Sequence, residues 1–281
     1  MMERIGIDIG GTKIDLARVD DNGDVLAHHR LPTNAQDGIS AVVSQIATGI
    51  SALGGEKNIP VGVGCAGVID EGVIKYAGNL GWRDVPLQAL LAEKLNRRVV
   101  VENDVRAALV GETRYGVARD VADVIYLAIG TGLGAAAVVD GRLLRGSRGM
   151  AMELGYVKYA DGTLYEHGAS GTGLGMIAKS LGMTDNTHRI IELWRMGDET
   201  ATRAVNTLIE NIAVACAWTC SILTPRMVVL GGGMGLALGE KLVDGVKKII
   251  AVRCADFVTD GLSVHLASVT NSAVGAAALN D

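Results

Sequence analysis

Three glycine-rich stretches in this sequence have the composition of phosphate-binding turns. Each follows a short apolar run, and their sequences are DIGGTK at 8–13, IGTGLG at 129–134 and LGGG at 230–233. Backbone N–H groups exposed in a turn, together with a threonine hydroxyl, can bind the oxygens of a phosphate. One such turn alone is weak evidence. The first two have similar flanks, and together they favour a site that binds a polyphosphate from opposite sides.

The flanks of these turns exclude two common nucleotide-binding folds. Residues 14–20 and 24–31 alternate apolar and polar side chains around a turn signal at 21–23, and residues 122–130 and 135–141 lie on either side of the second turn in a similar way. Such patterns predict strands joined as hairpins. A Rossmann fold or a P-loop needs a helix directly after its glycine turn. The first cluster alone is equally consistent with glycines that merely permit a tight turn.

A polar triplet at the end of an apolar strand is the second candidate for chemistry. Glu102, Asn103 and Asp104 follow the apolar run 99–101 and precede a helical pattern at 105–116. Phosphoryl transfer depends on positioning and charge neutralisation, with one carboxylate orienting the attacking hydroxyl. An aspartate that begins a helix is also a good N-cap, and taken alone Asp104 favours that role. Together with the two phosphate turns, it is a candidate base.

The first turn also carries a carboxylate and an ammonium group. Asp8 lies between Ile7 and Ile9. A buried carboxylate is costly without a partner. A magnesium ion reached through water would supply one, and a hydrogen-bonded turn aspartate is the alternative. Lys13 could neutralise phosphate or could be a solvated charge.

The order of the predicted elements favours two α/β lobes. Strands expected at 61–67 and 97–104 alternate with helical patterns in the first half, and helices expected at 171–181, 187–196 and 201–223 dominate the second. A strand at 227–230, a helix at 240–251, a strand at 262–266 and a last helix from 271 complete the chain. We expect an N-terminal lobe of residues 1–112 plus 268–281, a C-terminal lobe of 113–267, and a cleft between them.

Composition narrows the functional classes. The 281 residues are 49% hydrophobic and carry a net charge of −5, so nucleic acid is not an expected partner. The mean hydropathy is +0.30. The longest charge-free tract, 261–280, is nevertheless too polar to span a bilayer, which predicts a soluble, cytoplasmic protein without a membrane partner. The four cysteines lack zinc-ligand spacing and are expected to be buried thiols, although a metal pair at Cys216 and Cys220 is a weaker alternative.

Seven motifs occur here in the order found in one family of proteins. They are GIDIGGTK, NLGW, VENDVRAALVGE, LAIGTGLG, ELGY, EHGASG and VVLGGG, and they cover essentially the whole chain. The sequence resembles the ROK sugar kinases. The resemblance implies the duplicated actin/hexokinase ATPase fold (ribonuclease H-like), ATP at the glycine clusters, a sugar hydroxyl as phosphate acceptor and a homodimer.

The resemblance also implies roles for individual residues. The catalytic base is Asp104, and the sugar is bound by Gly67, Asn79, Asn103, Asp104, Glu153, Tyr156 and Glu166. ATP is bound by Asp8, Gly10, Gly11, Thr12, Lys13, Gly130, Thr131, Gly132, Gly134, Gly231, Gly232 and Gly233. Asp8 holds Mg²⁺ through water. From the residues alone, Glu153 and Glu166 could be surface charges, and 231–233 could be a loop where helix and sheet pack closely.

Two motifs depart from the family pattern. ELGY places Tyr156 where many ROK kinases have a zinc-binding histidine, and residues 157–168 contain no cysteine and are shorter than the usual zinc loop. His167 alone cannot hold zinc, which normally needs four ligands. The sequence therefore predicts no zinc site. In CAG, at 65–67, a proline that commonly precedes the glycine is missing.

The leading functional hypothesis is an ATP- and Mg²⁺-dependent kinase of a hexose, most simply one that phosphorylates the 6-hydroxyl of glucose or a glucose-like sugar. The alternative in the same class is a kinase of an amino sugar or another modified hexose, such as 3-amino-glucose or N-acetylmannosamine. A non-catalytic, sugar-responsive regulator is the third hypothesis, and the first strand beginning near Met1 together with the lack of a basic stripe argues against it.

Overall fold

A computed structural model describes residues 2–56 and 58–280, which fold as two compact α/β units. The first unit comprises Met1–Asp120, Arg145–Ala151 and Ser268–Asp281. The second comprises Val121–Leu144 and Met152–Ala267. The C-terminal segment is therefore part of the unit that the N-terminus begins.

In the expected lobes, as in these units, the chain returns to the N-terminal part at residue 268. They differ in two respects. A boundary after residue 112 would cut the helix Asp104–Tyr115, which stays whole in the first unit. The segment Arg145–Ala151 also belongs to the first unit although its flanks belong to the second. As functional lobes, 1–112 with 268–281 and 113–267 stay a prediction.

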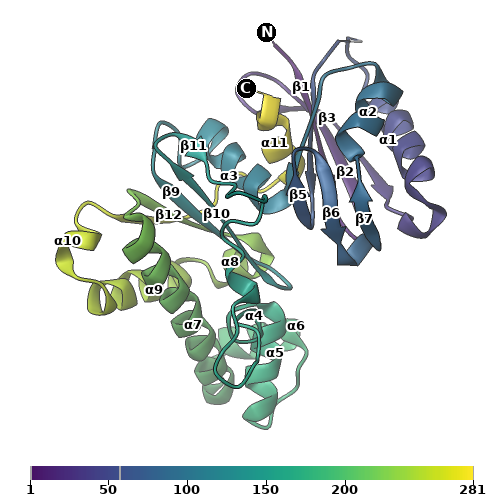
Figure 1. The fold of residues 1–281 in the computed structure, drawn as a ribbon. Coiled ribbons are helices and arrows are strands. Elements are labelled where there is room, and N and C mark those ends of the chain that lie inside the picture. Colours follow the sequence, from purple (N-terminus) through teal and green to yellow (C-terminus); the bar gives the residue numbers. More distant parts are fainter. Residues whose placement is uncertain (1, 57, 281) are drawn as a thin grey trace. The chain divides into compact units, whose positions relative to one another are not determined.

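The first unit is built on a five-stranded sheet in the order β3-β2-β1-β4-β8. Figure 1 labels its strands β1, β2 and β3. β1, β2 and β3 pair antiparallel, whereas β1, β4 and β8 run parallel. The strands are β1 Arg4–Ile9, β2 Lys13–Val19, β3 Val25–Pro32, β4 Val61–Cys65 and β8 Val99–Asn103. A second, antiparallel sheet contains β5 Val68–Asp70, β6 Val73–Ala77 and β7 Trp82–Val85.

Burial explains why these strands form where they do. β4 is buried along its whole length, as parallel strands covered on both faces are, whereas the edge strand β3 has no buried residue and alternates between exposed and partly exposed positions. The helices are α1 Ile39–Leu53, α2 Leu87–Leu95, α3 Asp104–Tyr115 and α11 Ser272–Ala277, with 3₁₀ turns η1 Ala35–Asp37, η2 Gly78–Leu80 and η4 Ala278–Asn280. The hairpin of β2 and β3 confirms that no helix follows the first glycine turn.

The second unit repeats this sheet. Its strand order is β11-β10-β9-β12-β13, with β9, β10 and β11 antiparallel and β9, β12 and β13 parallel. The strands are β9 Val124–Ile129, β10 Leu133–Val139, β11 Arg142–Leu143, β12 Met227–Gly231 and β13 Ser263–Leu266. The same order and the same directions in both sheets are the mark of a duplicated fold.

Helices make up most of the rest of the second unit. They are α4 Glu166–Ala169, α5 Gly171–Ser180, α6 Thr187–Arg195, α7 Glu199–Leu223, α8 Gly232–Leu238, α9 Glu240–Arg253 and α10 Asp256–Thr259, with the 3₁₀ turn η3 Leu154–Tyr156. Among the described residues, α7 alone is long and apolar enough to cross a membrane. It packs against α5 and α9 and contributes buried side chains such as Leu208 and Ile212 to the core of the unit. Its apolar character is therefore explained by packing.

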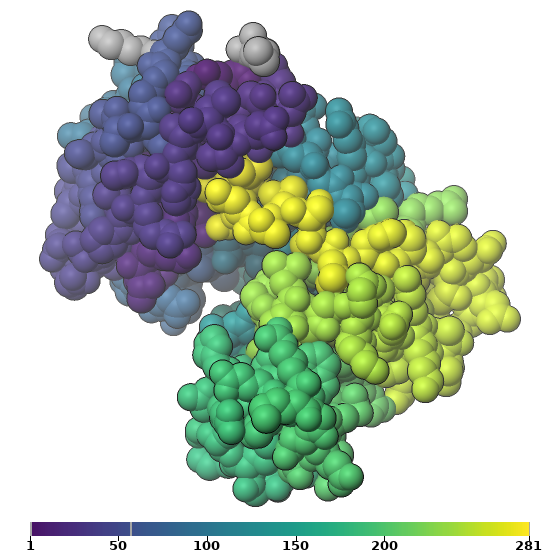
Figure 2. Space-filling view, turned by 180° about the vertical axis from the view of Figure 1, so that it is seen from behind, coloured from purple at the N-terminus to yellow at the C-terminus, as the bar shows by residue number. Residues whose placement is uncertain are grey.

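Glycines in neighbouring strands bring α11 unusually close to the first sheet. Gly6 and Gly62 are register partners in β1 and β4. A Cβ at Gly6 would lie 1.7 Å from the carbonyl oxygen of Ala273, and one at Gly62 would lie 1.9 Å from that of Ala276. In Figure 2 the C-terminal residues (yellow) lie against the N-terminal strands (purple). This contact holds Ser272, the first residue of α11, at the sheet.

We predict that Gly62→Ala lowers the free energy of unfolding by about 3 kcal/mol, because overpacking against backbone atoms cannot be relieved by a rotamer change. Urea denaturation measures the loss. Gly78→Ala is the control, because its Cβ would meet, at 3.0 Å, the hydroxyl of Tyr76, an exposed side chain that can move. Equal stabilities of the two variants would show that α11 does not need the glycines.

Candidate active site

The parallel register of the first sheet brings distant polar residues to one edge. Ile9, Cys65 and Asn103 are neighbours across β1, β4 and β8, so the three strands end together. Burial raises the pKa of the Cys65 thiol, and the nearby carboxylates of Asp104 and Asp8 raise it further. The two predicted site carboxylates of this unit therefore lie close to one another, as expected for the carboxyl ends of neighbouring parallel strands.

Asn103, and not Asp104, is the N-cap of α3. Its side-chain oxygen accepts hydrogen bonds from the backbone N–H groups of Val105 at 3.0 Å and Arg106 at 3.1 Å. Its amide nitrogen donates to the carbonyl oxygen of Gly67 and to Oδ1 of Asp104, both at 3.0 Å. Helix capping, the alternative to catalysis for Asp104, is therefore the role of its neighbour Asn103. Asp104 is the first residue of the helix, where the helix dipole favours negative charge.

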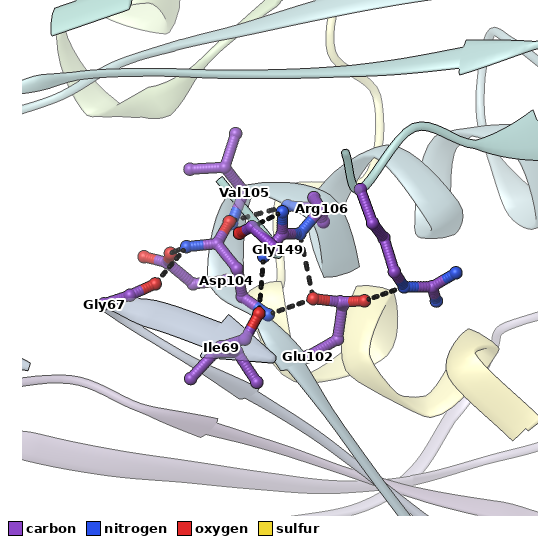
Figure 3. A network of polar contacts seen from close by, with 9 residues as sticks. Gly67, Ile69, Glu102, Asp104, Val105, Arg106 and Gly149 are labelled. Carbon is purple, nitrogen blue, oxygen red and sulfur yellow. Dashed lines mark hydrogen bonds and ion pairs between the residues drawn. The ribbon is translucent and has the colours of Figure 1, made fainter. Parts of the chain in front are cut away.

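A buried ion pair supports this strand end (Figure 3). Glu102 is 4% exposed and accepts hydrogen bonds from Nε of Arg106 at 2.8 Å and from Nε of Arg145 at 2.7 Å. The guanidinium of Arg106, itself 2% exposed, also donates to the carbonyl oxygens of Gly149 at 2.9 Å and Ile69 at 3.3 Å. One side chain thereby joins the start of α3 to strand β5 and to the loop at Gly149.

Sequence reasoning assigned no role to Glu102 or Arg106. A signal was present, because an acidic and a basic residue four apart at an apolar strand end need a partner when both are buried. The partners of Arg106 in β5, at Ile69, and in the loop at Gly149 could not be inferred from spacing along the chain.

Asp8 has a protein partner from the far end of the sequence. The hydroxyl of Ser272 donates to Oδ2 of Asp8 at 2.5 Å. Burial raises the pKa of Asp8 despite this hydrogen bond. Asp8 is therefore a hydrogen-bonded aspartate through one of its two carboxylate oxygens. Oδ1 has no hydrogen-bond partner among residues 2–56 and 58–280, and this oxygen could accept a hydrogen bond from water.

Lys13 forms an ion pair within the sheet. Its ammonium lies 3.0 Å from Oδ2 of Asp15, and Arg30 and His28 lie 2.6 and 3.2 Å from the other oxygen. Burial alone would raise the pKa of Asp15, but the hydrogen bonds from Arg30 and Lys13 lower it. Lys13 is thus more than a solvated charge, and its contact with phosphate stays a prediction.

The glycines of the first turn are not required by a left-handed backbone conformation. Neither Gly10 nor Gly11 has a positive φ, and a Cβ on either would meet its nearest atom at 3.3 Å. For Gly11 that atom is Cβ of Asn79, so this predicted sugar-binding residue adjoins the turn. Gly67 differs, because its φ is +134° and a Cβ would lie 2.4 Å from the carbonyl oxygen of Tyr76.

The second unit contains the other predicted phosphate turn. The carbonyl oxygen of Gly130 accepts a hydrogen bond from the N–H of Gly171 at 2.8 Å, and that of Thr131 accepts one from Thr172 at 3.2 Å. At Gly130 and Gly233 φ is not positive, and a Cβ would meet nothing within 4 Å. Nothing in the described chain requires glycine at these two positions. Their assignment to the ATP site stays a prediction.

Three of the other predicted glycines of this unit, Gly132, Gly231 and Gly232, have reasons within the chain. A Cβ at Gly132 would lie 2.5 Å from Oε2 of Glu166, one at Gly231 would lie 2.0 Å from the hydroxyl of Tyr126, and Gly232 has a φ of +78°. Gly134 lies in β10 opposite Ala128. Close helix–sheet packing therefore accounts for part of the third cluster.

The predicted sugar-binding residues of the second unit lie around the same turn. Oε2 of Glu166 accepts a hydrogen bond from the N–H of Leu133 at 3.3 Å. A Cβ at Gly155, in η3, would lie 2.5 Å from the carbonyl oxygen of Leu133. Glu153 precedes η3 and is the centre of an inverse γ-turn, with φ −73° and ψ 57° and a 2.7 Å bond from Leu154 N–H to the Met152 carbonyl. Tyr156, which ends η3, is 64% exposed.

The structure thus groups the predicted residues by unit. The first unit brings together Asp8, Gly10, Gly11, Gly67, Asn79, Asn103 and Asp104, with Thr12 and Lys13 in the adjoining turn. The second groups Gly130, Thr131, Gly132, Glu166 and Gly231–Gly233 at the junction of β12 and α8, and η3 places Glu153 and Tyr156 beside them. Their roles in binding stay predictions. The four cysteines are buried and free, as expected.

Comparison with known proteins now decides the family. The family model described as "ROK family" matches residues 4–281. This chain belongs to the ROK family. It is 30% identical to a glucokinase of Halalkalibacterium halodurans, covering 96% of this chain and 91% of that protein, and 31% identical to a glucokinase of Streptomyces coelicolor, covering 87% and 86%.

A solved structure gives the same assignment. The ROK family glucokinase of Streptomyces griseus, in complex with glucose and AMPPNP, superimposes with a TM-score of 0.83 at 28% identity, covering 99% of this chain and 98% of that one. The fold of this ROK protein is that of the actin/hexokinase-like ATPases, as predicted, and the duplicated sheets are its signature.

The residues present do not fit the zinc site of many ROK kinases. Residues 153–168 offer His167, Asp161, two glutamates and three tyrosines but no thiolate. Across residues 2–56 and 58–280, no group of three or more His, Cys, Asp or Glu side chains is arranged to hold a metal ion. A zinc-free protein stays a prediction.

We predict that Arg106→Met lowers the free energy of unfolding by about 3–5 kcal/mol, because it leaves the buried Glu102 carboxylate without its main partner. Arg145→Met is the matched control, since Arg145 pairs with the same carboxylate but its side chain is 55% exposed, and its removal should cost under about 1 kcal/mol. Chemical denaturation of both variants measures the difference. Equal losses would contradict the role given to Arg106.

Proposed function

We propose that this ROK protein is an ATP-dependent hexose kinase that phosphorylates the 6-hydroxyl of glucose or of a glucose-like sugar. The observation that carries the proposal is the position of Asp104, whose carboxylate begins α3 and accepts a hydrogen bond from the cap residue Asn103. The relatives named glucokinases, and the Streptomyces griseus enzyme in complex with glucose and AMPPNP, support the choice of sugar and nucleotide.

In this proposal Asp104 is the general base. Its carboxylate accepts the proton of the sugar hydroxyl as that oxygen bonds to the γ-phosphorus, and ADP leaves with the electrons of the broken P–O bond. The amide of Asn103 already donates to Asp104, and this bond limits rotation of the carboxylate. Gly67 and Asn79 contribute to sugar binding from the neighbouring loops, and in the second unit Glu153, Tyr156 and Glu166 complete the set.

The nucleotide is assigned to the glycine turns. A Cβ at Gly130 or Gly233 would meet no atom of the described chain within 4 Å, and this open space is where we place close contact with ATP. Mg²⁺ bound with ATP would neutralise charge on the transferred phosphoryl group. Asp8 fits a water-mediated role toward that ion through Oδ1, because Ser272 occupies the other oxygen.

The alternative sugars differ in what they would need from the second unit. A kinase of an amino sugar or another modified hexose stays the second candidate, because Tyr156 stands where the family has a zinc-linked histidine. A tyrosine hydroxyl in place of that imidazole changes the hydrogen-bond pattern. The homodimer, the cytoplasmic location and the absence of nucleic-acid and membrane partners belong to this proposal and rest on the sequence and the family resemblance.

We predict that Asp104→Asn lowers kcat by roughly 10² to 10⁴ while sugar still binds, because the amide keeps the shape of the carboxylate but cannot accept the proton. Coupled ADP release measures turnover, and calorimetry measures sugar binding. Asp256→Asn is the control, because Asp256 is likewise the first residue of a helix, α10. Turnover within a few-fold of the wild type would rule out Asp104 as the base.

We predict that Gly130→Ala keeps the melting temperature of the wild type but raises the KM for ATP about tenfold, a change of about 1.4 kcal/mol. The reason is that a methyl group at this position meets no atom of the protein within 4 Å and can disturb only a ligand. The KM for sugar is the internal control and should stay unchanged. An unaltered KM for ATP would remove Gly130 from the nucleotide site.

A further inference from the structure

Residues Val157–Tyr165 form a short hairpin that leads directly into α4. Lys158 and Leu164 pair as an antiparallel bridge, the N–H of Tyr159 donates to the carbonyl oxygen of Thr163 at 2.8 Å, and the N–H of Tyr165 donates to that of Val157 at 2.7 Å. The tip is an Asp-Gly turn in which Gly162 has a φ of +85°. The hairpin occupies the stretch where zinc-bearing ROK kinases have their metal loop.

The hairpin is attached to α7 by aromatic rings and hydrogen bonds. The ring centroid of Tyr165 lies 5.2 Å from that of Tyr159 and 5.1 Å from that of Trp218. The hydroxyl of Tyr165 donates to the backbone carbonyl of Asn211 at 2.6 Å, and the side-chain amide of Asn211 donates to the carbonyl oxygen of Gly168 at 2.8 Å. Asn211 and Trp218 are seven residues apart, two turns of α7, and so lie on one face of that helix.

These contacts surround the residue that bears a proposed sugar ligand. Tyr165 precedes Glu166, and Gly168 follows it two positions later, so Asn211 holds the backbone on both sides of Glu166. The Glu166 side chain is fixed from the other direction by the N–H of Leu133 on Oε2. Its Oε1 accepts no hydrogen bond from the described residues. Glu166 is therefore a carboxylate with a fixed backbone, one held oxygen and one available oxygen.

Burial keeps the Tyr165 hydroxyl a donor. Tyr165 is 2% exposed, and burial raises the pKa of its phenol above the ordinary value, with Tyr159 raising it further. The hydroxyl therefore stays protonated at neutral and moderately alkaline pH, and the bond to Asn211 persists there. A metal ligand has no such constancy, because protons and chelators compete for it.

We propose that Tyr165 and Asn211 are positioning residues that aim Glu166 at the sugar, a task for which this chain needs no metal ion. The proposal rests on the proposed function, since it takes Glu166 as a sugar ligand. It assigns the work of a zinc loop to a hydrogen bond and an aromatic stack, and it agrees with the absence of a thiolate from residues 153–168. Neither Tyr165 nor Asn211 touches the sugar in this account.

The test compares two hydroxyl deletions within the same stack. Tyr165→Phe keeps the ring and removes the bond to Asn211, and we expect a five- to tenfold rise in the KM and Kd for sugar with kcat within twofold. Tyr159→Phe is the matched control, because its hydroxyl makes no hydrogen bond with another described residue, and it should change neither. Asn211→Ala removes the donor to Gly168 and should reproduce Tyr165→Phe. Activity in EDTA with excess Mg²⁺ should match that without chelator.

A double-variant cycle separates positioning from general loss of stability. If Tyr165 acts through Glu166, then Tyr165→Phe has no further effect on the sugar Kd in a Glu166→Gln background, whereas a merely structural effect adds to it. Melting temperatures identify any variant that is unfolded. Identical sugar Kd values for Tyr165→Phe and Tyr159→Phe, or additive effects in the cycle, overturn the inference. Wild-type protein that phosphorylates no hexose would instead overturn the proposed function.

Discussion

The parallel register of β1, β4 and β8 is the constraint on which the candidate site depends. Because Ile9, Cys65 and Asn103 are aligned across these strands, the residues that follow each strand emerge at one edge of the sheet. A one-residue slip of β8 would turn its side chains to the opposite face and misplace Asp104. The glycines Gly6 and Gly62, aligned in the same sheet, admit α11 at backbone distance and so bring Ser272 to Asp8.

Buried carboxylates stabilise both ends of α3. At its start Glu102 binds Arg106, which in turn donates to backbone carbonyl oxygens of strand β5 and of the loop at Gly149. Near its end Glu112, 1% exposed, accepts hydrogen bonds from the N–H groups of Val117, Ser268 and Val269 at 3.0, 2.8 and 2.7 Å. Val117 lies just before the chain leaves the first unit, and Ser268 is where it returns. The helix that begins with the proposed base is therefore fixed at its other end to both connecting segments.

Much of the fold was predictable because the local patterns are strong. The alternation around the first two glycine turns predicted β2, β3 and β10, and the turn signals predicted where the strands end. The sheet of β5, β6 and β7 was not predicted, since its strands are short and two of them are half exposed. The three-dimensional partners were also beyond sequence reasoning. Ser272 and Asp8 are 264 positions apart, and no spacing rule connects them.

In the candidate site, too, residue types could be read from the sequence but three-dimensional partners could not. The phosphate turns and Asp104 could be proposed from residue types, because their chemistry depends on a few neighbouring groups. That Asn103 caps α3, that Lys13 binds Asp15 and that Tyr165 supports the backbone around Glu166 all depend on packing. Only the backbone structure separates the glycines that the surrounding chain requires from those that it does not. Gly132, Gly231 and Gly232 are required by their neighbours, whereas Gly130 and Gly233 are not.

The central claim is that Asp104 directs a sugar hydroxyl, and not water, at the γ-phosphate. Phosphorus NMR of a reaction with glucose, ATP and Mg²⁺ in ¹⁸O-labelled water tests it most directly. The account predicts one new sugar phosphate whose phosphorus couples to the protons on carbon 6, formed in equal amount to ADP and without ¹⁸O. Release of ¹⁸O-labelled inorganic phosphate, or no ADP with any hexose, would contradict it.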